Sequence, residues 1–363
     1  MIGVGLKAGI AMGIGLPGGG CAAAVRAGAA PYEMPLESEP HLRTLMQWPV
    51  ALATYGARDL ARVQAAIVRV ANAIAEHEPV AMLAAPDAIG LKRPAFSGGV
   101  EFWEIPTDDL WCRDSGPTFV RGADGKLAVA HIRFNGWGGK QPHANDALVA
   151  PRVASRLGLT LVDSGVVGEQ GGVEHDGDGT MLAHASCWVN DNRNPGLSAD
   201  RIAARLGVAL GARKMIWAPG IKGADITDDH IDGLARFVGP GRVVIQIDDE
   251  LDPGDPGSLS AHRTLAILER ATDARGRRLS IVRLPEPEDI RSRREDFVAS
   301  YVNYYVCNGA VIAPQFGDQR ADDEARETLA TLYPGRAVVM LDIDAIGESG
   351  GGIHCATQQQ PRG

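Results

Sequence analysis

The sequence lacks long apolar runs, paired cysteines and an excess of positive charge. No apolar stretch reaches the roughly 18 residues that a transmembrane helix needs, so none is predicted in the body of the protein. Lysine and arginine number 36 against 45 aspartates and glutamates, a formal net charge of −9. This balance argues against a surface for nucleic acid or acidic lipid, and it is compatible with a cationic substrate. An acidic surface that maintains solubility explains the charge equally well.

The cysteines do not form a recognisable framework. The five are odd in number and include no CxxC pair, so neither a disulfide scaffold nor a zinc ribbon is indicated, and reduced thiols are the simpler interpretation. They are Cys21, Cys112, Cys187, Cys307 and Cys355. Cys112 and Cys307 stand in apolar-rich segments and are expected to be packing residues.

The first 31 residues differ in composition from the rest of the chain. Lys7 precedes a Gly/Ala-rich, moderately apolar stretch that runs to Gly20 and leads into Cys21. Two interpretations stay open: a signal peptide with Cys21 as a lipid-modified residue, or a disordered leader from an upstream start codon. The expected location is therefore the cytoplasm, or outside it if residues 1–31 are a signal.

Apolar periodicity predicts helices alternating with short strands. Val63, Ile67, Val70 and Ile74 recur at helical spacing, and Val80–Ala85 is typical of a short buried strand. Further helices are predicted at 147–157, 199–206, 259–271 and 321–332. Further strands are predicted at 100–105, 127–134, 159–163, 180–189, 214–218, 231–238, 242–247, 280–284 and 337–343, with a strand pair on either side of 308–309.

This pattern predicts an α/β protein built from similar units, each with one helix and about three strands. No residue-level repeat is visible, so the repetition is structural at most. The alternation also fits a doubly wound sheet. Length alone would allow two domains.

Two acidic segments carry residues suited to chemistry. His230 and Asp232 open a predicted strand, where positions i and i+2 project from the same face, and a His beside a carboxylate suits proton transfer. In the turn ending at Gly116-Pro117, Trp111 can cover a cation and Asp114 can accept a pair of N–H donors. A purely structural hydrogen-bonded pair explains each segment about equally well.

The C-terminal segment brings three glycines, 350–352, close to the thiol of Cys355. Glycine allows a positive φ and close approach to the backbone, and a cysteine thiolate is a strong nucleophile. Taken alone, the cysteine would be a buried packing residue. The adjacent His354 is expected to be structural, because neighbours on extended chain face opposite ways.

Five segments follow one another in this order: WCRDSGP, GGVEHDGDGT, GADITDDHIDGLARF, SYVNYYVCNGAVIAPQFGD and GGGIHCATQQQP. Together they resemble the motifs of the agmatine deiminase family, relatives of the bacterial peptidylarginine deiminases among the guanidine-modifying enzymes. The resemblance runs from about Tyr32 to Pro361. It implies a five-fold pseudosymmetric α/β propeller (pentein-like) of ββαβ units. It also implies that residues 32–363 are a single catalytic domain behind the leader.

The resemblance also implies residue roles. Cys355 is the nucleophile, His230 the general acid and base, and Asp114 and Asp232 the carboxylates that bind the guanidinium. Glu169 matches a catalytic glutamate before the family's Gly pair, and Trp111 the aromatic beside the site. Gln170 replaces the first glycine of that pair, which leaves Glu174 as a rival to Glu169. Ser38 replaces a tryptophan of the family's entry segment.

The implied reaction is hydrolysis of agmatine to N-carbamoylputrescine and ammonia, a step towards putrescine, with no metal and no cofactor. Peptidyl-arginine is the alternative substrate, an amidinotransferase shares the covalent step, and a catalytically silent agmatine or polyamine binder is the alternative of another class. A zinc site would need His230, Asp232 and Cys355 as ligands and explains the acidic motifs less well. A homo-oligomer stays open.

Overall fold

The computed structural model describes residues 23–24, 31–50, 52–88 and 95–363. The predicted leader, residues 1–31, lies outside the described residues except at positions 23, 24 and 31, so the signal interpretation and the modification of Cys21 stay predictions.

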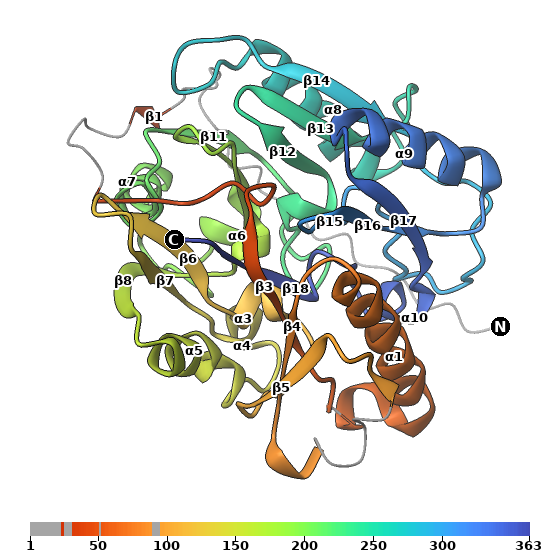
Figure 1. Ribbon diagram of the computed structural model, residues 1–363. Coiled ribbons are helices and arrows are strands. Elements are labelled where there is room, and N and C mark those ends of the chain that lie inside the picture. Colours follow the sequence, from red (N-terminus) through yellow and green to blue (C-terminus); the bar gives the residue numbers. More distant parts are fainter. Residues whose placement is uncertain (1–22, 25–30, 51, 89–94) are drawn as a thin grey trace, which may run out of the picture.

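The described residues form five small sheets (Figure 1). The first sheet has the strand order β18 (Thr357–Pro361), β3 (His41–Gln47), β4 (Val80–Ala84), β5 (Val100–Glu104). The second has β2 (Tyr32–Glu33), β6 (Thr118–Gly122), β7 (Leu127–Arg133), β8 (Thr160–Val167). The third has β1 (Ala23–Ala24), β11 (Lys214–Ala218), β10 (Thr180–His184), β9 (Val173–His175). The fourth has β12 (Ala235–Gly239), β13 (Arg242–Gln246), β14 (Ser280–Leu284), and the fifth β15 (Tyr305–Val306), β16 (Ala310–Gln315), β17 (Ala337–Asp342).

Every sheet contains the same ββαβ unit. An antiparallel strand pair is followed by a helix that leads to a strand parallel to the second of the pair. The connecting helices are α1 (Leu52–Ala75), α5 (Val149–Leu157), α7 (Ala199–Leu210), α8 (Pro256–Arg270) and α9 (Gln319–Leu332), and they lie around the outside of the molecule in Figure 1. The fold is thus the predicted five-fold pseudosymmetric α/β propeller, and the doubly wound alternative is wrong because the strands belong to separate sheets.

The first sheet closes the ring. Its antiparallel pair joins β18, near the end of the chain, to β3, near the beginning, with Thr357 opposite Met46 and Gln359 opposite Thr44. Since β18 begins two residues after Cys355, this pairing ties the segment of the predicted nucleophile to β3.

The helices form where the sequence predicts them because their apolar faces are buried and their ends are capped. Val63, Ile67, Val70 and Ile74 of α1 are at most 1% exposed. Side chains at the N-caps of α7, α8 and α9 accept backbone N–H groups, which satisfies donors that a helix leaves unpaired. These caps are Ser198, Asp255 and Asp318.

Two strand predictions need correction. The strand expected at 231–238 begins only at Ala235, because Asp228 and Asp229 have positive φ angles of 63° and 70° and turn the chain into the 3-10 helix η4 (Ile231–Gly233). The strand expected at 180–189 ends at His184, where α6 (Ala185–Trp188) begins. Both short helices are largely buried, so their apolar pattern is continuous with that of the neighbouring strands.

Candidate active site

The predicted site residues occupy equivalent places in the propeller. Each lies on the segment that enters the first strand of a unit: Asp114 before β6, Glu169 before β9, Asp232 before β12 and Cys355 before β18. The corresponding segment before β15 carries Asn303. Because these five strands are equivalent by pseudosymmetry, residues at their starts are brought together from distant parts of the sequence. Three of these residues lie in or next to short helices. Asp114 lies in α3 (Cys112–Ser115), Glu169 directly precedes η3 (Gln170–Gly172), and Asp232 lies in η4.

His230 lies between two carboxylates. Its Nε2 is 3.2 Å from Oε2 of Glu169, and its Nδ1 is 3.7 Å from Oδ1 of Asp114. Burial on its own would lower the pKa of the imidazole, but Asp114 and Glu169 outweigh it and raise the pKa of His230 to about 9. The histidine is therefore protonated at neutral pH, as a general acid must be.

Asp114 is a buried carboxylate held by two donors. The indole Nε1 of Trp137 donates to its Oδ2 over 2.8 Å, and the backbone N–H of Gly171 donates to its Oδ1 over 3.2 Å. Burial raises the pKa of Asp114 to about 6, against the opposing effect of His230. A buried carboxylate is costly to keep ionised, and a cation bound beside it lowers that cost. Asp114 is therefore suited to bind a cationic group.

Gly171 is the point on which the three groups converge. A Cβ added to this residue would lie 2.7 Å from Asp114 Oδ1, 2.8 Å from His230 Nδ1 and 3.1 Å from Asp232 Oδ2. The first two separations are shorter than real Cβ contacts and the third is tight, so a side chain here would displace at least one of the three groups. His230 and Asp232 therefore share a site, although a 3-10 turn rather than a strand face brings them together.

Asp232 links the site to the thiol. Its Oδ2 is 2.7 Å from Nδ1 of His354 and 3.6 Å from Sγ of Cys355. Burial would raise the pKa of this carboxyl, but the hydrogen bond and charge of His354, with help from His230, bring it below its ordinary value.

Cys355 is half-buried and is held by Asn303 at two points. The Asn303 side chain accepts the Cys355 backbone N–H over 3.2 Å and donates its amide Nδ2 to Sγ over 3.2 Å. Burial, followed by the charges of Asp232 and Asp114, raises the pKa of the thiol well above its ordinary value. The high pKa favours the neutral thiol while no guanidinium is bound between the two carboxylates.

The glycines before Cys355 accommodate neighbouring side chains. A Cβ at Gly351 would lie 2.4 Å from the ring of Trp111, and one at Gly352 would lie 2.4 Å from Oδ1 of Asn303. Gly350 has a φ of 95°, which favours glycine. Close approach explains the run of glycines, and it places Trp111 against the segment that carries the thiol.

The two rival glutamates have different partners. Glu169 contacts His230, and both of its carboxylate oxygens accept the N–H of Arg193 Nε, each at 2.9 Å. Glu174 pairs with Arg236 at 3.1 Å and is 3.8 Å from His354 Nε2. Glu169 therefore stands beside the imidazole despite the Gln170 replacement.

Two residues of the site, Trp137 and Asn303, were not predicted. Trp137 lies in α4 (Gly136–Gly139), a glycine-rich turn in which it takes a φ of 55°. Such a strained aromatic between glycines is a usable signal for a functional turn. Asn303 lies inside one of the five motifs, but nothing in its local pattern marks it as a site residue.

Cys112 and Cys307 lie in the hydrophobic core, buried in apolar clusters, as expected of packing residues. Within the described part of the chain, no group of three or more His, Cys, Asp or Glu side chains is arranged to hold a metal ion. Of the helices that the structure describes, none is both long and apolar enough to cross a bilayer.

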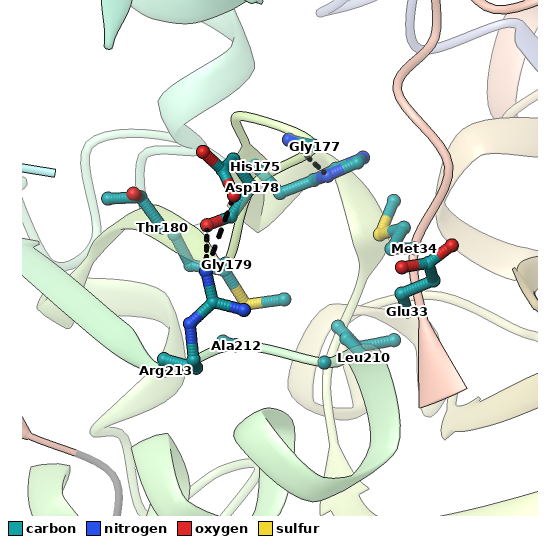
Figure 2. Close-up of a pocket in the computed structure, with 12 residues that line it drawn as sticks. Glu33, Met34, His175, Gly177, Asp178, Gly179, Thr180, Leu210, Ala212 and Arg213 are labelled. Atoms are coloured by element: carbon teal, nitrogen blue, oxygen red, sulfur yellow. Dashed lines mark hydrogen bonds and ion pairs between the residues drawn. The ribbon is translucent and has the colours of Figure 1, made fainter. Parts of the chain in front are cut away.

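A separate small cavity, of about 70 Å³, lies between β2, the start of β10 and the end of α7. Figure 2 shows Arg213 directed at Asp178 there, with hydrogen bonds of 2.6 Å to the carbonyl oxygen and 3.3 Å to Oδ1. None of the predicted site residues lines this cavity, so we do not connect it with the site.

Comparison with known proteins gives one consistent family. Residues 33–361 match the family described as Porphyromonas-type peptidyl-arginine deiminase. A protein of Streptomyces coelicolor named "Putative agmatine deiminase" is 39% identical, over 91% of this chain and 99% of its own. A Selenomonas ruminantium protein of the same name is 37% identical, over 91% and 96%.

A solved structure, the agmatine deiminase of Enterococcus faecalis catalysing its reaction, superposes with a TM-score of 0.84 at 28% identity, covering 92% of this chain and 96% of that one. The fold, the order of the motifs and the length of the match agree. The chain belongs to the Porphyromonas-type peptidyl-arginine deiminase family.

Proposed function

We propose that this protein hydrolyses the guanidine group of agmatine, giving N-carbamoylputrescine and ammonia through a covalent intermediate on Cys355. The observation that carries the proposal is the placement of two buried carboxylates, Asp114 and Asp232, around one imidazole and beside one thiol. A planar cation with several N–H donors suits this arrangement.

Asp114, Asp232 and Trp111 form the proposed guanidinium site. Carboxylates on either side accept N–H donors, neutralise the positive charge and fix the central carbon near the sulfur. Trp111 borders the glycine segment that carries the thiol, where its ring can cover the face of a bound cation.

The first half of the reaction removes ammonia. The Cys355 thiolate forms a C–S bond to the guanidinium carbon, and protonated His230 gives its proton to one terminal nitrogen. The C–N bond to that nitrogen breaks, ammonia leaves, and a cationic amidino-thioether remains on the sulfur. Glu169, hydrogen-bonded to Nε2, stabilises and orients the imidazolium before this transfer.

The second half consumes water. Neutral His230 takes a proton from a water molecule, whose oxygen attacks the amidino carbon. The C–S bond then breaks, the ureido product forms as its hydroxyl proton passes to solvent, and the thiolate is regenerated.

Substrate charge is the proposed trigger for the thiol. With the pKa of Cys355 held high by Asp232 and Asp114, the free site favours the neutral thiol. A bound guanidinium offsets both carboxylates, which lowers the cost of ionising the sulfur. The thiol proton then passes to solvent, and His230 keeps its own proton for the leaving nitrogen.

We propose agmatine rather than peptidyl-arginine as the substrate because the Streptomyces coelicolor and Selenomonas ruminantium relatives are both named putative agmatine deiminase. The family description, which refers to peptidyl-arginine, makes that substrate the second candidate. We further propose that residues 32–363 act as one catalytic domain, a view supported by the ring closure of β18 on β3.

The test is a colorimetric assay for ureido product with agmatine, free arginine and a peptidyl-arginine, with Cys355→Ala as the matched control. Product from agmatine, absent in the variant, is the expected result. Product from peptidyl-arginine alone would keep the chemistry and overturn the substrate. If no guanidine yields product, but calorimetry shows agmatine binding without turnover, the silent-binder alternative replaces the enzyme.

A further inference from the structure

We propose that His354 is a positioning residue that donates from both ring nitrogens and so holds Asp232 in the orientation needed to bind the guanidinium. This inference rests on the proposed function of the same site. It assigns His354 a task distinct from that of His230, although each histidine lies between two carboxylates.

Both ring nitrogens of His354 face carboxylate oxygens. Nδ1 is 2.7 Å from Asp232 Oδ2, and Nε2 is 3.0 Å from Glu37 Oε2. An ionised carboxylate can only accept hydrogen bonds, and a neutral imidazole has a single N–H. Both contacts are satisfied together when the ring carries a proton on each nitrogen, which is the imidazolium form.

The charges around His354 also require that form. It is buried, 2% exposed, within a cluster whose other members are the cations of Arg113 and Arg236 and the carboxylates of Glu37, Glu174 and Asp232. Two arginines balance two of the three carboxylates, and His230, the cation on the other side of Asp232, is already held between Asp114 and Glu169. A protonated His354 completes the balance, and an unpaired buried charge is strongly destabilising.

The cluster is rigid on the side away from the substrate. Glu37 is held by Arg113 at 3.0 Å, by Arg236 at 3.0 Å and by the backbone N–H of Val306 at 2.9 Å. Arg113 also donates its Nε to the backbone oxygen of His354 over 3.3 Å. The imidazolium is therefore fixed at one nitrogen and through its own backbone, so that Nδ1 can act as a fixed support for Asp232.

His354 does not serve as the base for Cys355. Both of its nitrogens are committed to carboxylates, and Asp232 lies between the ring and the sulfur, with the same Oδ2 close to both. The groups that face Asp232 are thus His354, Cys355 and, across Gly171, His230. A fixed cation behind Asp232 keeps that carboxylate ionised through the cycle while His230 gives up and regains its proton.

Two substitutions separate the nitrogens. The amide nitrogen of His354→Asn is attached at Cγ, as Nδ1 is, and retains a donor towards Asp232. The amide nitrogen of His354→Gln lies one bond further out, near the position of Nε2, and retains a donor towards Glu37 only. Both remove the charge and the ring.

The expected result is a difference between these variants in the steady-state assay with agmatine. His354→Gln should lower kcat/KM about 10- to 100-fold more than His354→Asn, with the larger part in KM, because a hydrogen bond to a charged group is lost at the binding carboxylate. Thermal unfolding of both variants checks that they fold. Equal losses in kcat/KM would overturn the positioning role and leave a purely structural one.

A second readout does not depend on turnover. In protein labelled with ¹⁵N-histidine, the signal that disappears in His354→Asn identifies this ring, and both of its nitrogens should carry a directly bonded proton at the pH of the activity assay. A ring with one unprotonated nitrogen would overturn the proposal. If wild-type protein makes no ureido product but the doubly protonated ring is present, the proposed function fails and the imidazolium assignment stands.

Discussion

The indole N–H of Trp137 donates to Oδ2 of Asp114 over 2.8 Å and ties a carboxylate of α3 to a turn that lies two strands further along the chain. Trp137 is 3% exposed, and its ring packs edge-on against Phe134 at a centroid distance of 5.0 Å. The contact fixes one oxygen of Asp114 and leaves the other near His230.

Trp137→Phe should therefore weaken guanidinium binding without unfolding the protein. The ring remains but the donor to a charged group is lost, so kcat/KM for agmatine should fall about 10- to 100-fold. Steady-state kinetics measures the change. Trp217→Phe is the control, since the buried Trp217 Nε1 has no acceptor among the described residues and its loss should leave kcat/KM near wild type.

Asn303 is expected to set the reactivity of the thiol. Asn303→Leu removes the donor to Sγ and should raise the pKa of Cys355 further, which slows its alkylation by iodoacetamide at a given pH. Mass spectrometry of the peptide that contains Cys355 follows the rate across a pH series. An unchanged rate profile would show that the amide only positions the backbone.

Gly171→Ala should abolish turnover by steric conflict. The added methyl group would lie against Asp114, His230 and Asp232 at once, so at least one must move, and a fall of 100-fold or more in kcat is expected as an order of magnitude. Gly233→Ala is the matched control, because it is next to Asp232 and its Cβ would meet nothing within 4 Å. Comparable losses in both variants would argue against convergence on Gly171.

The elevated pKa of His230 makes stability depend on pH with a definite sign. A histidine whose pKa rises from about 6.5 unfolded to about 9 folded stabilises the native state fully below pH 6.5 and loses that contribution as pH rises through 9. Urea unfolding at pH 6.5 and 9.5 should show a decrease in unfolding free energy on the order of 1–3 kcal/mol from this group. His230→Gln should remove that part of the decrease, and an identical pH dependence in the variant would contradict the assignment.

Much of this fold could be predicted because the helices and turns of each unit have their own short-range sequence signals. The helical spacing of residues in α1 and the turn at Asn308-Gly309 correspond directly to elements of the structure. The strand expected from Ile231 failed because the apolar residues of a buried 3-10 turn cannot be told from those of a strand, and nothing in the sequence reveals that Asp228 and Asp229 adopt positive φ.

The candidate-site residues that the family resemblance names could be predicted from the sequence. Residues that join the site only through tertiary contacts could not. The pairing of His230 with Glu169 and Asp114 follows motifs, whereas the donor from Trp137 crosses between segments 23 residues apart. Asn303 becomes obvious only once the units are superposed, since it occupies the place held by Asp114, Glu169, Asp232 and Cys355 in the others. Pseudosymmetry without sequence repetition conceals such equivalence.

The pairing of β18 with β3 has a consequence for how activity is gained and lost. Residues more than 310 positions apart must meet before Cys355 reaches its neighbours, and contacts this distant in sequence are slow to form because of the entropy of loop closure. In a newly synthesised chain, the thiol of Cys355 therefore stays apart from the assembled carboxylates until β18 pairs with β3. In the folded protein, local opening of the β18–β3 pair would abolish activity while the other four sheets keep their own strand pairing. Loss of activity should therefore precede loss of fold on gentle heating.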